Sequence, residues 1–250
     1  FMAEPDAIRR RINSWVEEQT ARRIAELLPP GSVNAETRLV LANAVYFKGR
    51  WLTEFDPAKT SPGSFQVTAE RSVEIPFMRA KMKARFAAMD SIAVLELPFA
   101  GDDLVMLLLL PRDNEVLNAL GSGLSLAHLD AWSRVLRETQ VDIALPRFTI
   151  NYGFSLRLLL SEMGMPSAFT AQADFSGISA DSELFISEAF HKAFIQVDEQ
   201  GAEAAAATGT VMGVTSVGPG FIADHPFLFL IRDRVTGGIL FLGRMQNPAS

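Results

Sequence analysis

The stretch that decides the fold is FISEAFHKAFIQVDEQGAEAAAATGTVMGVTSVGPG, residues 185–220. Its first part belongs to an apolar run, Leu184–Val197, that predicts a long strand. Another apolar run, Pro226–Ile231, follows the stretch. Between the two runs, Glu199–Gly220 is rich in Gly, Ala, Ser and Thr, which is typical of a flexible linker. A structureless stretch of this length inside a compact domain is unusual, and such stretches are commonly functional or disordered.

Residues 202–213 would have two different faces if they were extended, because alternate side chains of a strand point to opposite sides. One face is uncharged and mostly small, and it consists of Ala202, Ala204, Ala206, Thr208, Thr210 and Met212. The other face carries the only charge, at Glu203. A small, uncharged face can enter a packed sheet without overfilling the core. The segment is therefore compatible with two states, an exposed loop and an inserted strand.

Composition and charge narrow the class of protein. The chain has 250 residues, of which 48% are hydrophobic and 21% charged, so it is a globular protein rather than a disordered one. Its net charge of -6 makes nucleic acid an unfavourable partner, since a phosphate backbone needs a basic face. There is no cysteine, so disulfides and thiolate metal sites are excluded. The longest apolar run, Leu104–Pro111, is too short to span a membrane.

The common catalytic motifs do not occur. The sequence has no GxSxG elbow, no HExxH, no phosphate loop and no GxGxxG that opens a helix. The only histidines are His128, His191 and His225, and the first two lie within a predicted helix and a predicted strand, where a structural role is expected. A Ser/His/Asp triad stays open at this point, because its members come together in space rather than in sequence.

The order of the predicted elements indicates the α+β class, because strands and helices alternate without a regular βαβ rhythm. Helices are predicted at Pro5–Leu28, Leu126–Glu138 and Phe154–Met163, the last ended by Gly164; strands at Arg38–Trp51, Ser64–Ala69, Ala93–Pro98, Leu104–Leu110, Val141–Ile150 and Leu184–Val197; and a last hairpin at Pro226–Ile231 and Ile239–Leu242. The nearly continuous apolar sequence of Arg38–Trp51 suits a strand that is buried on both faces. Gly101-Asp102-Asp103 is expected to form the hairpin turn before Leu104.

From end to end the chain resembles a serpin, a member of the serine protease inhibitor superfamily. The matching segments are INSWVEEQT (Ile12–Thr20), LANAVYFKGRW (Leu41–Trp51), LPRFTINYGFSL (Leu145–Leu156), ADFSGIS (Ala173–Ser179), EAFHKAFIQVDEQGAEAAAAT (Glu188–Thr208) and DHPFLFLIRDRVTGGILFLGRMQNP (Asp224–Pro248). The hinge pattern E-x-G-x-E-A-A-A-A-T is the most specific of these and is similar to that of inhibitory members, and we expect a bacterial one. The resemblance implies a single domain over residues 1–250, with a large central mixed sheet, smaller sheets, surrounding helices and an exposed reactive loop.

The resemblance also implies a mechanism. A serpin offers its loop as bait, the protease forms an acyl-enzyme, and the loop then inserts into the central sheet and traps the protease. The family's spacing puts the reactive bond at Thr215–Ser216, in a loop of about Gly201–Val217. The uncharged Thr215 favours an elastase-, subtilisin- or chymotrypsin-like serine protease over a trypsin-like one. We expect a covalent complex with such a protease, no nucleic acid or membrane partner, and a monomer that can form loop–sheet polymers. Because a serpin supplies no catalytic residue, the resemblance also implies that the protein is not an enzyme, and we expect no metal and no cofactor.

Three groups of residues match conformational control sites of the family. The hinge comprises Glu199, Gly201, Ala202, Glu203, Ala204, Ala205, Ala206, Ala207 and Thr208. Asn43 and His191 match the shutter, a polar cluster beneath the sheet, where burial would require the two side chains to pair. Trp51 matches the tryptophan of the breach, where the loop first enters.

Two features depart from the family pattern. The N-terminal helical region that would precede Pro5–Leu28 is missing, so an upstream region is expected to be absent from this sequence. Gly209 and Gly213 would weaken an inserted strand. The alternative is a non-inhibitory serpin-fold protein that acts as a binding, carrier or chaperone-like module, since a fold does not settle function.

Overall fold

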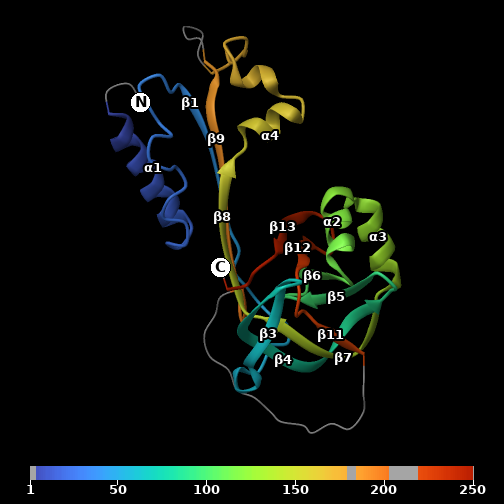
Figure 1. Cartoon of the computed structure of the whole chain (residues 1–250). Coiled ribbons are helices and arrows are strands. Elements are labelled where there is room, and N and C mark those ends of the chain that lie inside the picture. Colours follow the sequence, from blue (N-terminus) through green and yellow to red (C-terminus); the bar gives the residue numbers. More distant parts are fainter. Residues whose placement is uncertain (1–3, 179–183, 203–218, 250) are drawn as a thin grey trace. The chain divides into compact units, whose positions relative to one another are not determined.

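The structure, a computed structural model, describes residues 4–178, 184–202 and 219–249 (Figure 1). The chain divides into two compact units. The first comprises residues 1–47 and 150–195, and the second comprises residues 48–149 and 196–250. That residues 1–250 form one domain stays a prediction.

The first unit is built on a three-stranded sheet with the order β1-β9-β8. Its strands are β1 (Leu39–Tyr46), β9 (Ile186–Val197) and β8 (Phe148–Ser155), of which β8 and β9 run on into the second unit. β1 and β9 are parallel, with Asn43 opposite His191 and Tyr46 opposite Phe194. The unit also contains α1 (Pro5–Gln19), α4 (Arg157–Glu162) and the 3₁₀ turn η2 (Pro166–Phe169).

The first helix is shorter than predicted, since α1 ends at Gln19 rather than Leu28. Ala21 and Arg22 have positive φ angles of 49° and 63°, which break the helix. The later apolar residues, spaced as in a helix, belong to a segment that folds back, and Ile24, Leu27 and Leu28 share a core cluster with Val16 and Phe194. The Asn13 side chain holds this return, because its Oδ1 accepts from the backbone N–H groups of Leu27 and Leu28 at 3.1 and 2.9 Å.

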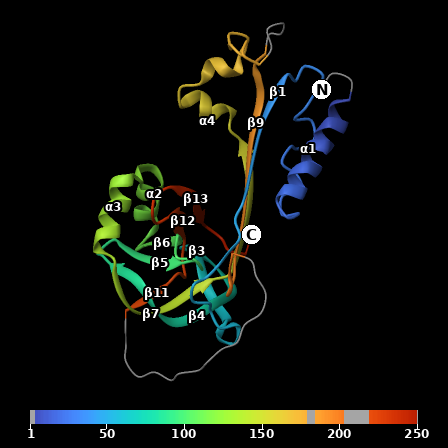
Figure 2. The same ribbon diagram turned by 180° about the vertical axis from the view of Figure 1, so that it is seen from behind.

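The prediction that Arg38–Trp51 is one strand buried on both faces was wrong. The region contains β1 and a separate short strand, β2 (Gly49–Arg50), and Leu41, Ala42 and Asn43 are exposed. Val40, Ala44 and Tyr46 pack on the cluster around α1, so within the described residues that cluster covers one face of β1. α1 lies beside β1 (Figure 2). The apolar sequence alone could not show how many faces would be covered.

The second unit contains a mixed sheet of eight strands with the order β11-β7-β4-β5-β6-β12-β13, and β3 pairs beside β4. The strands are β3 (Ser61–Thr68), β4 (Arg71–Ala88), β5 (Ile92–Pro98), β6 (Leu104–Pro111), β7 (Arg137–Pro146), β11 (Gly220–Ile222), β12 (Phe227–Asp233) and β13 (Ile239–Met245). Among the described residues, β11 and β7 are the one parallel pair of this sheet, and its other neighbours are antiparallel. The second unit also has the 3₁₀ turn η1 (Pro57–Lys59) and a two-stranded pair of β2 with β10 (Gly201–Ala202).

Two helices, α2 (Asn114–Gly123) and α3 (Leu126–Val135), cover part of this sheet (Figures 1 and 2). Leu117, Leu129 and Trp132 pack on apolar residues of β5, β6 and β12 and form a buried cluster. The sequence predicted α3, which begins after its N-cap Ser125, but it did not predict α2. α3 also ends at Val135, three residues before the predicted Glu138, because the chain enters β7 at Arg137.

The α+β class is confirmed, and so are both hairpin turns. β5 and β6 are antiparallel across Gly101, and β12 and β13 are antiparallel across Gly237, and both glycines have positive φ. The predicted strand Val141–Ile150 is divided between β7 and β8, and the predicted helix Phe154–Met163 is the shorter α4. Among the described residues, no helix is long and apolar enough to cross a membrane.

Candidate functional site

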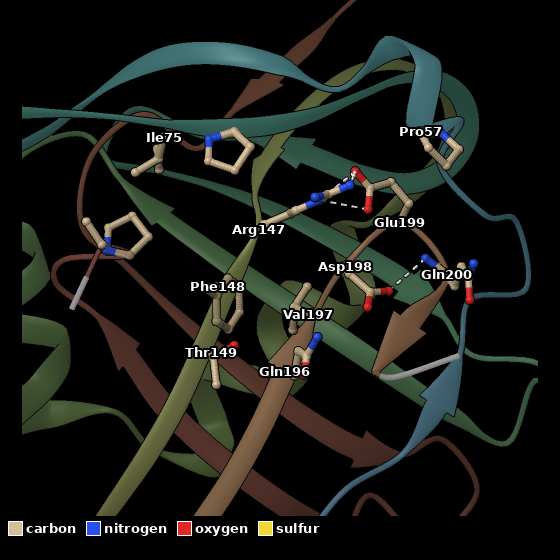
Figure 3. A pocket seen from close by; sticks show the side chains of 13 residues that line it. Pro57, Ile75, Arg147, Phe148, Thr149, Gln196, Val197, Asp198, Glu199 and Gln200 are labelled. Carbon is tan, nitrogen blue, oxygen red and sulfur yellow. Dashed lines mark hydrogen bonds and ion pairs between the residues drawn. The ribbon is translucent and has the colours of Figure 1, made fainter. Parts of the chain in front are cut away.

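The hinge of the predicted reactive loop is a tight turn directly after β9. Asp198 and Gly201 exchange two backbone hydrogen bonds, with N···O distances of 2.9 and 3.2 Å. The backbone N–H of Gln200 also donates to the carboxylate of Asp198 at 3.0 Å (Figure 3). Because of this turn, the chain leaves β9 and continues as β10, which pairs with β2 in the antiparallel sense.

Gly201 is required at this turn for two independent reasons. Its φ angle of 133° lies in a region that side chains with a Cβ rarely adopt. A Cβ there would also lie 2.2 Å from the carbonyl oxygen of Gly49 and 2.7 Å from the backbone nitrogen of Trp51. The turn therefore depends on close approach between two backbones.

Glu199 is held by several side-chain contacts. It is 4% exposed. The guanidinium of Arg147 donates to it from Nε, at 2.7 Å to Oε1 and 2.8 Å to Oε2, and Arg147 Nη2 lies 2.6 Å from Oε1 (Figure 3). The hydroxyl of Thr60 also donates to Oε1. A carboxylate buried in this way requires such partners, because an unpaired buried charge is costly.

These contacts decide the protonation of Glu199. Burial is the largest single influence and by itself would raise the pKa of the carboxyl. The hydrogen bonds from Arg147, from Thr60 and from the residue's own backbone N–H, together with the charge of Arg147, outweigh burial and hold the pKa below its ordinary value near 4.5. Glu199 is therefore an anion at neutral pH, and the ion pair is part of the folded hinge.

Trp51 also contacts this turn. Its indole is 3% exposed and stacks on Phe99, with ring centroids 4.7 Å apart and planes 9° from parallel. The indole Nε1–H donates to the carbonyl of Asp198 at 2.9 Å, and the backbone N–H of Trp51 donates to the carbonyl of Gln200 at 2.8 Å. The structure thus brings together three of the predicted residues: Glu199, Gly201 and Trp51.

A cavity of about 550 Å³ opens beside the ion pair (Figure 3). Its walls are the turn itself, the start of β8, and apolar groups that include Ile75, Phe148 and Pro248. In the part of the chain that the structure describes, no group of three or more His, Asp or Glu side chains could hold a metal ion.

The predicted shutter pair lies in the first unit. His191 Nδ1 is 3.0 Å from Asn43 Oδ1, and the two residues face each other in the parallel ladder of β1 and β9. The ring of His191 also meets Phe154 edge to face, at a centroid distance of 5.5 Å. The two side chains pair as expected, and among the described residues Asn43 is exposed. That the pair acts as a shutter stays a prediction.

Most of the predicted loop lies outside the described residues. This holds for the predicted reactive bond, Thr215–Ser216, and for the hinge residues Glu203, Ala204, Ala205, Ala206, Ala207 and Thr208. Ala202 is described through its backbone, as the last residue of β10.

Sequence reasoning missed the partners of the hinge: Arg147, Thr60 and Phe99. Arg147 stands in LPRFTI, a segment that carried the resemblance, but nothing in the local pattern linked it to a carboxylate 52 positions further on. A buried acidic residue in an apolar context signals that a cation is needed, but it does not say which one.

Comparison with known proteins decides the family. The model of the family described as "Serpin (serine protease inhibitor)" matches residues 1–248. The chain belongs to the serpin family. Human plasminogen activator inhibitor 2 is 42% identical to this serpin over 268 residues, which cover 99% of this chain and 64% of the relative. Bovine leukocyte elastase inhibitor is 39% identical over 258 residues, which cover 99% of this chain and 68% of the relative.

Solved structures confirm the serpin fold. Uncleaved ovalbumin aligns with a TM-score of 0.91 and 37% identity, over 99% of this serpin and 68% of that chain. A complex of thyroxine-binding globulin with thyroxine aligns with a TM-score of 0.88 and 32% identity, over 97% of this serpin and 65% of that chain. This serpin thus spans about two thirds of the length of these relatives. The expectation of a bacterial source stays a prediction.

Proposed function

We propose that this serpin inhibits serine proteases as a suicide substrate, by inserting its reactive loop into the sheet of β1, β9 and β8. The protease's serine oxygen would attack the carbonyl carbon of Thr215, the Thr215–Ser216 amide bond would break, and the new amino group of Ser216 would leave with the proton. An ester then links the protease to Thr215. Because the serpin supplies a bond and a conformational change rather than a catalytic group, it is not an enzyme in this proposal.

The observation that carries the proposal is the direct pairing of β1 with β9. The two strands are parallel neighbours from Val40–Glu188 to Tyr46–Phe194, with no strand between them. The hinge turn at Asp198–Gly201 reverses the chain after β9, so a segment inserted between β9 and β1 would be antiparallel to both. Insertion would replace one parallel ladder with two antiparallel ladders, which are slightly more stable per residue. This provides a physical reason for the loop to enter once cleavage frees its far end.

The names of two relatives, leukocyte elastase inhibitor and plasminogen activator inhibitor 2, support protease inhibition by this serpin. The uncharged Thr215 favours an elastase-, subtilisin- or chymotrypsin-like partner, because a trypsin-like pocket selects Lys or Arg.

The test is incubation with elastase-, subtilisin-, chymotrypsin- and trypsin-like proteases, followed by denaturing gels and mass spectrometry. We expect a complex that survives SDS with one of the first three proteases, with the cut at Thr215–Ser216. Cleavage at that bond by all four proteases without any complex would contradict the proposal.

The second candidate is a non-inhibitory carrier or binding module, and the likeness to thyroxine-binding globulin favours it. The two candidates differ in what cleavage does to stability. Cleavage within Val211–Val217 should raise the melting temperature of an inhibitor sharply, because the freed loop adds a strand. A carrier whose loop stays outside should melt at nearly the same temperature before and after cleavage.

A charge on the small face of the loop should convert this inhibitor into a substrate. We expect Ala202→Arg to be cleaved at Thr215–Ser216 but to give little or no SDS-stable complex, because the arginine would have to enter a packed sheet before deacylation. Glu203→Arg is the matched control, since position 203 alternates to the other face and the change should leave the complex yield nearly unaltered. An undiminished yield of complex from Ala202→Arg would rule out the predicted inward face.

A further inference from the structure

His225 lies between the end of β11 and the start of β12, and both of its ring nitrogens face acceptors. Nδ1 is 2.8 Å from the Asp224 carboxylate, and Nε2 is 2.7 Å from the carbonyl oxygen of Pro111, at the end of β6. The imidazole side chain is 29% exposed. A neutral imidazole carries one N–H, so it can donate to only one of these acceptors, whereas an imidazolium donates to both.

The segment that His225 fastens is the end of the reactive region. β11 has three residues and pairs with β7 at the edge of the eight-stranded sheet. Pro219 accepts from the backbone N–H of Asp142 at 3.0 Å, and the backbone N–H of Ala223 donates to Ala144 at 2.9 Å. Within the described residues, β11 has one neighbouring strand, β7, and the side chains of Phe221 and Ala223 are fully buried. A tether at Asp224–His225 therefore adds to the contacts that must break before β11 detaches.

The charges around the ring favour the imidazolium. The hydrogen bond with Asp224 raises the pKa of His225 most strongly, burial opposes it, and the Pro111 carbonyl and the charge of Asp224 add to the increase. Arg112 directly follows β6, but its guanidinium donates to the Asp113 carboxylate at 3.3 Å and to the Asp90 carbonyl at 3.4 Å. From β3, the contact with this segment is the backbone N–H of Gln66, which donates to the Asp224 carbonyl at 2.7 Å.

We propose that protonated His225 is a clasp that fastens β11 to its sheet, and that loss of the proton makes the end of the reactive loop easier to release as the pH rises. The clasp is complete below the ordinary histidine pKa of about 6.5 and is lost as the pH rises through the higher value of the folded protein. Its functional meaning rests on the proposed inhibition, since an intact loop can enter the sheet only if its far end leaves β7. An inhibitor of this kind would lose its active form faster at alkaline pH than at mildly acidic pH.

The test is hydrogen exchange of the amides of residues 220–224, measured by mass spectrometry between pH 5.5 and 8.5. The protection factor of each amide is its intrinsic exchange rate at that pH divided by its measured rate. Only protection factors are compared, because the intrinsic rate itself changes with pH. We expect protection in the native serpin to fall about threefold or more over this range, and protection in His225→Gln to be low and independent of pH. Amides of β5 and β6 serve as the internal reference and should show no such fall.

A second variant separates the clasp from a general loss of packing. Asp224→Asn keeps the shape of the side chain but removes its charge, so the fall in protection should move to lower pH. The same pH profile in the native protein, His225→Gln and Asp224→Asn would overturn the proposal. These measurements use no protease, so the clasp can fail while inhibition stands, and inhibition can fail while the clasp stands.

Discussion

Arg147→Ala is expected to lower the free energy of unfolding by about 2 kcal/mol at pH 7, because it leaves the buried carboxylate of Glu199 without its cation. The loss is smaller than for a fully buried pair, since the Arg147 side chain is 43% exposed and solvent screens part of its charge. Thr60 would remain as a hydrogen-bond donor to Glu199, but a neutral hydroxyl cannot balance the charge. Denaturant unfolding of the purified variant measures the change. The loss should be concentrated at the hinge, so the amide of Phe55, which donates to the Glu199 carbonyl at 2.8 Å, should also exchange faster.

The effect of Arg147→Ala should depend on pH in a defined direction. In the native protein the pKa of Glu199 is lowered, so the stability from the ion pair is present above the ordinary value near 4.5 and is lost as the pH falls through the lower folded value. Without Arg147, burial raises the pKa of Glu199, and protonation then relieves the unpaired charge. The native protein and the variant should therefore differ less in stability at pH 4 than at pH 7.

Two further variants test whether the ion pair is the cause. Lys83→Ala removes an exposed lysine that lies 3.8 Å from Glu138, and it should have little effect, because exposed pairs contribute little. The double variant Arg147→Met with Glu199→Gln removes both charges and should recover most of the lost stability. If Arg147→Ala were as stable as the native protein at pH 7, the ion pair would not hold the hinge.

The turns of this fold could be predicted from the sequence because their determinants are local. Gly101 and Gly237 have positive φ angles of 97° and 74°. Each lies at a break between two apolar runs, Gly101 before Asp-Asp and Gly237 after Thr, and such a break already indicates a hairpin. The end of α1 could not be predicted in this way. Ala21 and Arg22 adopt positive φ although nothing in their type favours it, and the return of Leu27 and Leu28 depends on packing with Phe194, far along the chain.

The sequence also could not predict a long strand whose neighbouring strands change along its length. β4 has 18 residues, and its neighbour is β3 near Val73, β7 near Met82 and β5 near Ala87. Each partner imposes its own burial on the strand, so the sequence resembles several short runs instead of one alternation. For the same reason the site was predicted only in part. Glu199 and Gly201 stand in a recognisable motif. The contact of Arg147 with Glu199, by contrast, depends on how the chain between β7 and β8 packs in three dimensions.

Gly201→Ala is expected to destabilise the protein by about 3 kcal/mol, from backbone strain and overpacking together. The new methyl group would lie 2.2 Å from the Gly49 carbonyl oxygen and 2.6 Å from the Arg50 Cα, both backbone atoms that cannot rotate away. Relief requires β10 to separate from β2, which would also weaken the hydrogen bond from the Trp51 backbone to Gln200.

Gly121→Ala is the matched control for this change, because it adds the same methyl group in α2, where nothing lies within 4 Å. It should leave stability unchanged or raise it by up to about 1 kcal/mol, since alanine favours a helix more than glycine does. Equal stability of the two variants in denaturant unfolding would mean that the hinge can take another path past β2. A loss confined to Gly201→Ala would instead mean that the loop leaves the sheet along one fixed path, set by the contact between two backbones.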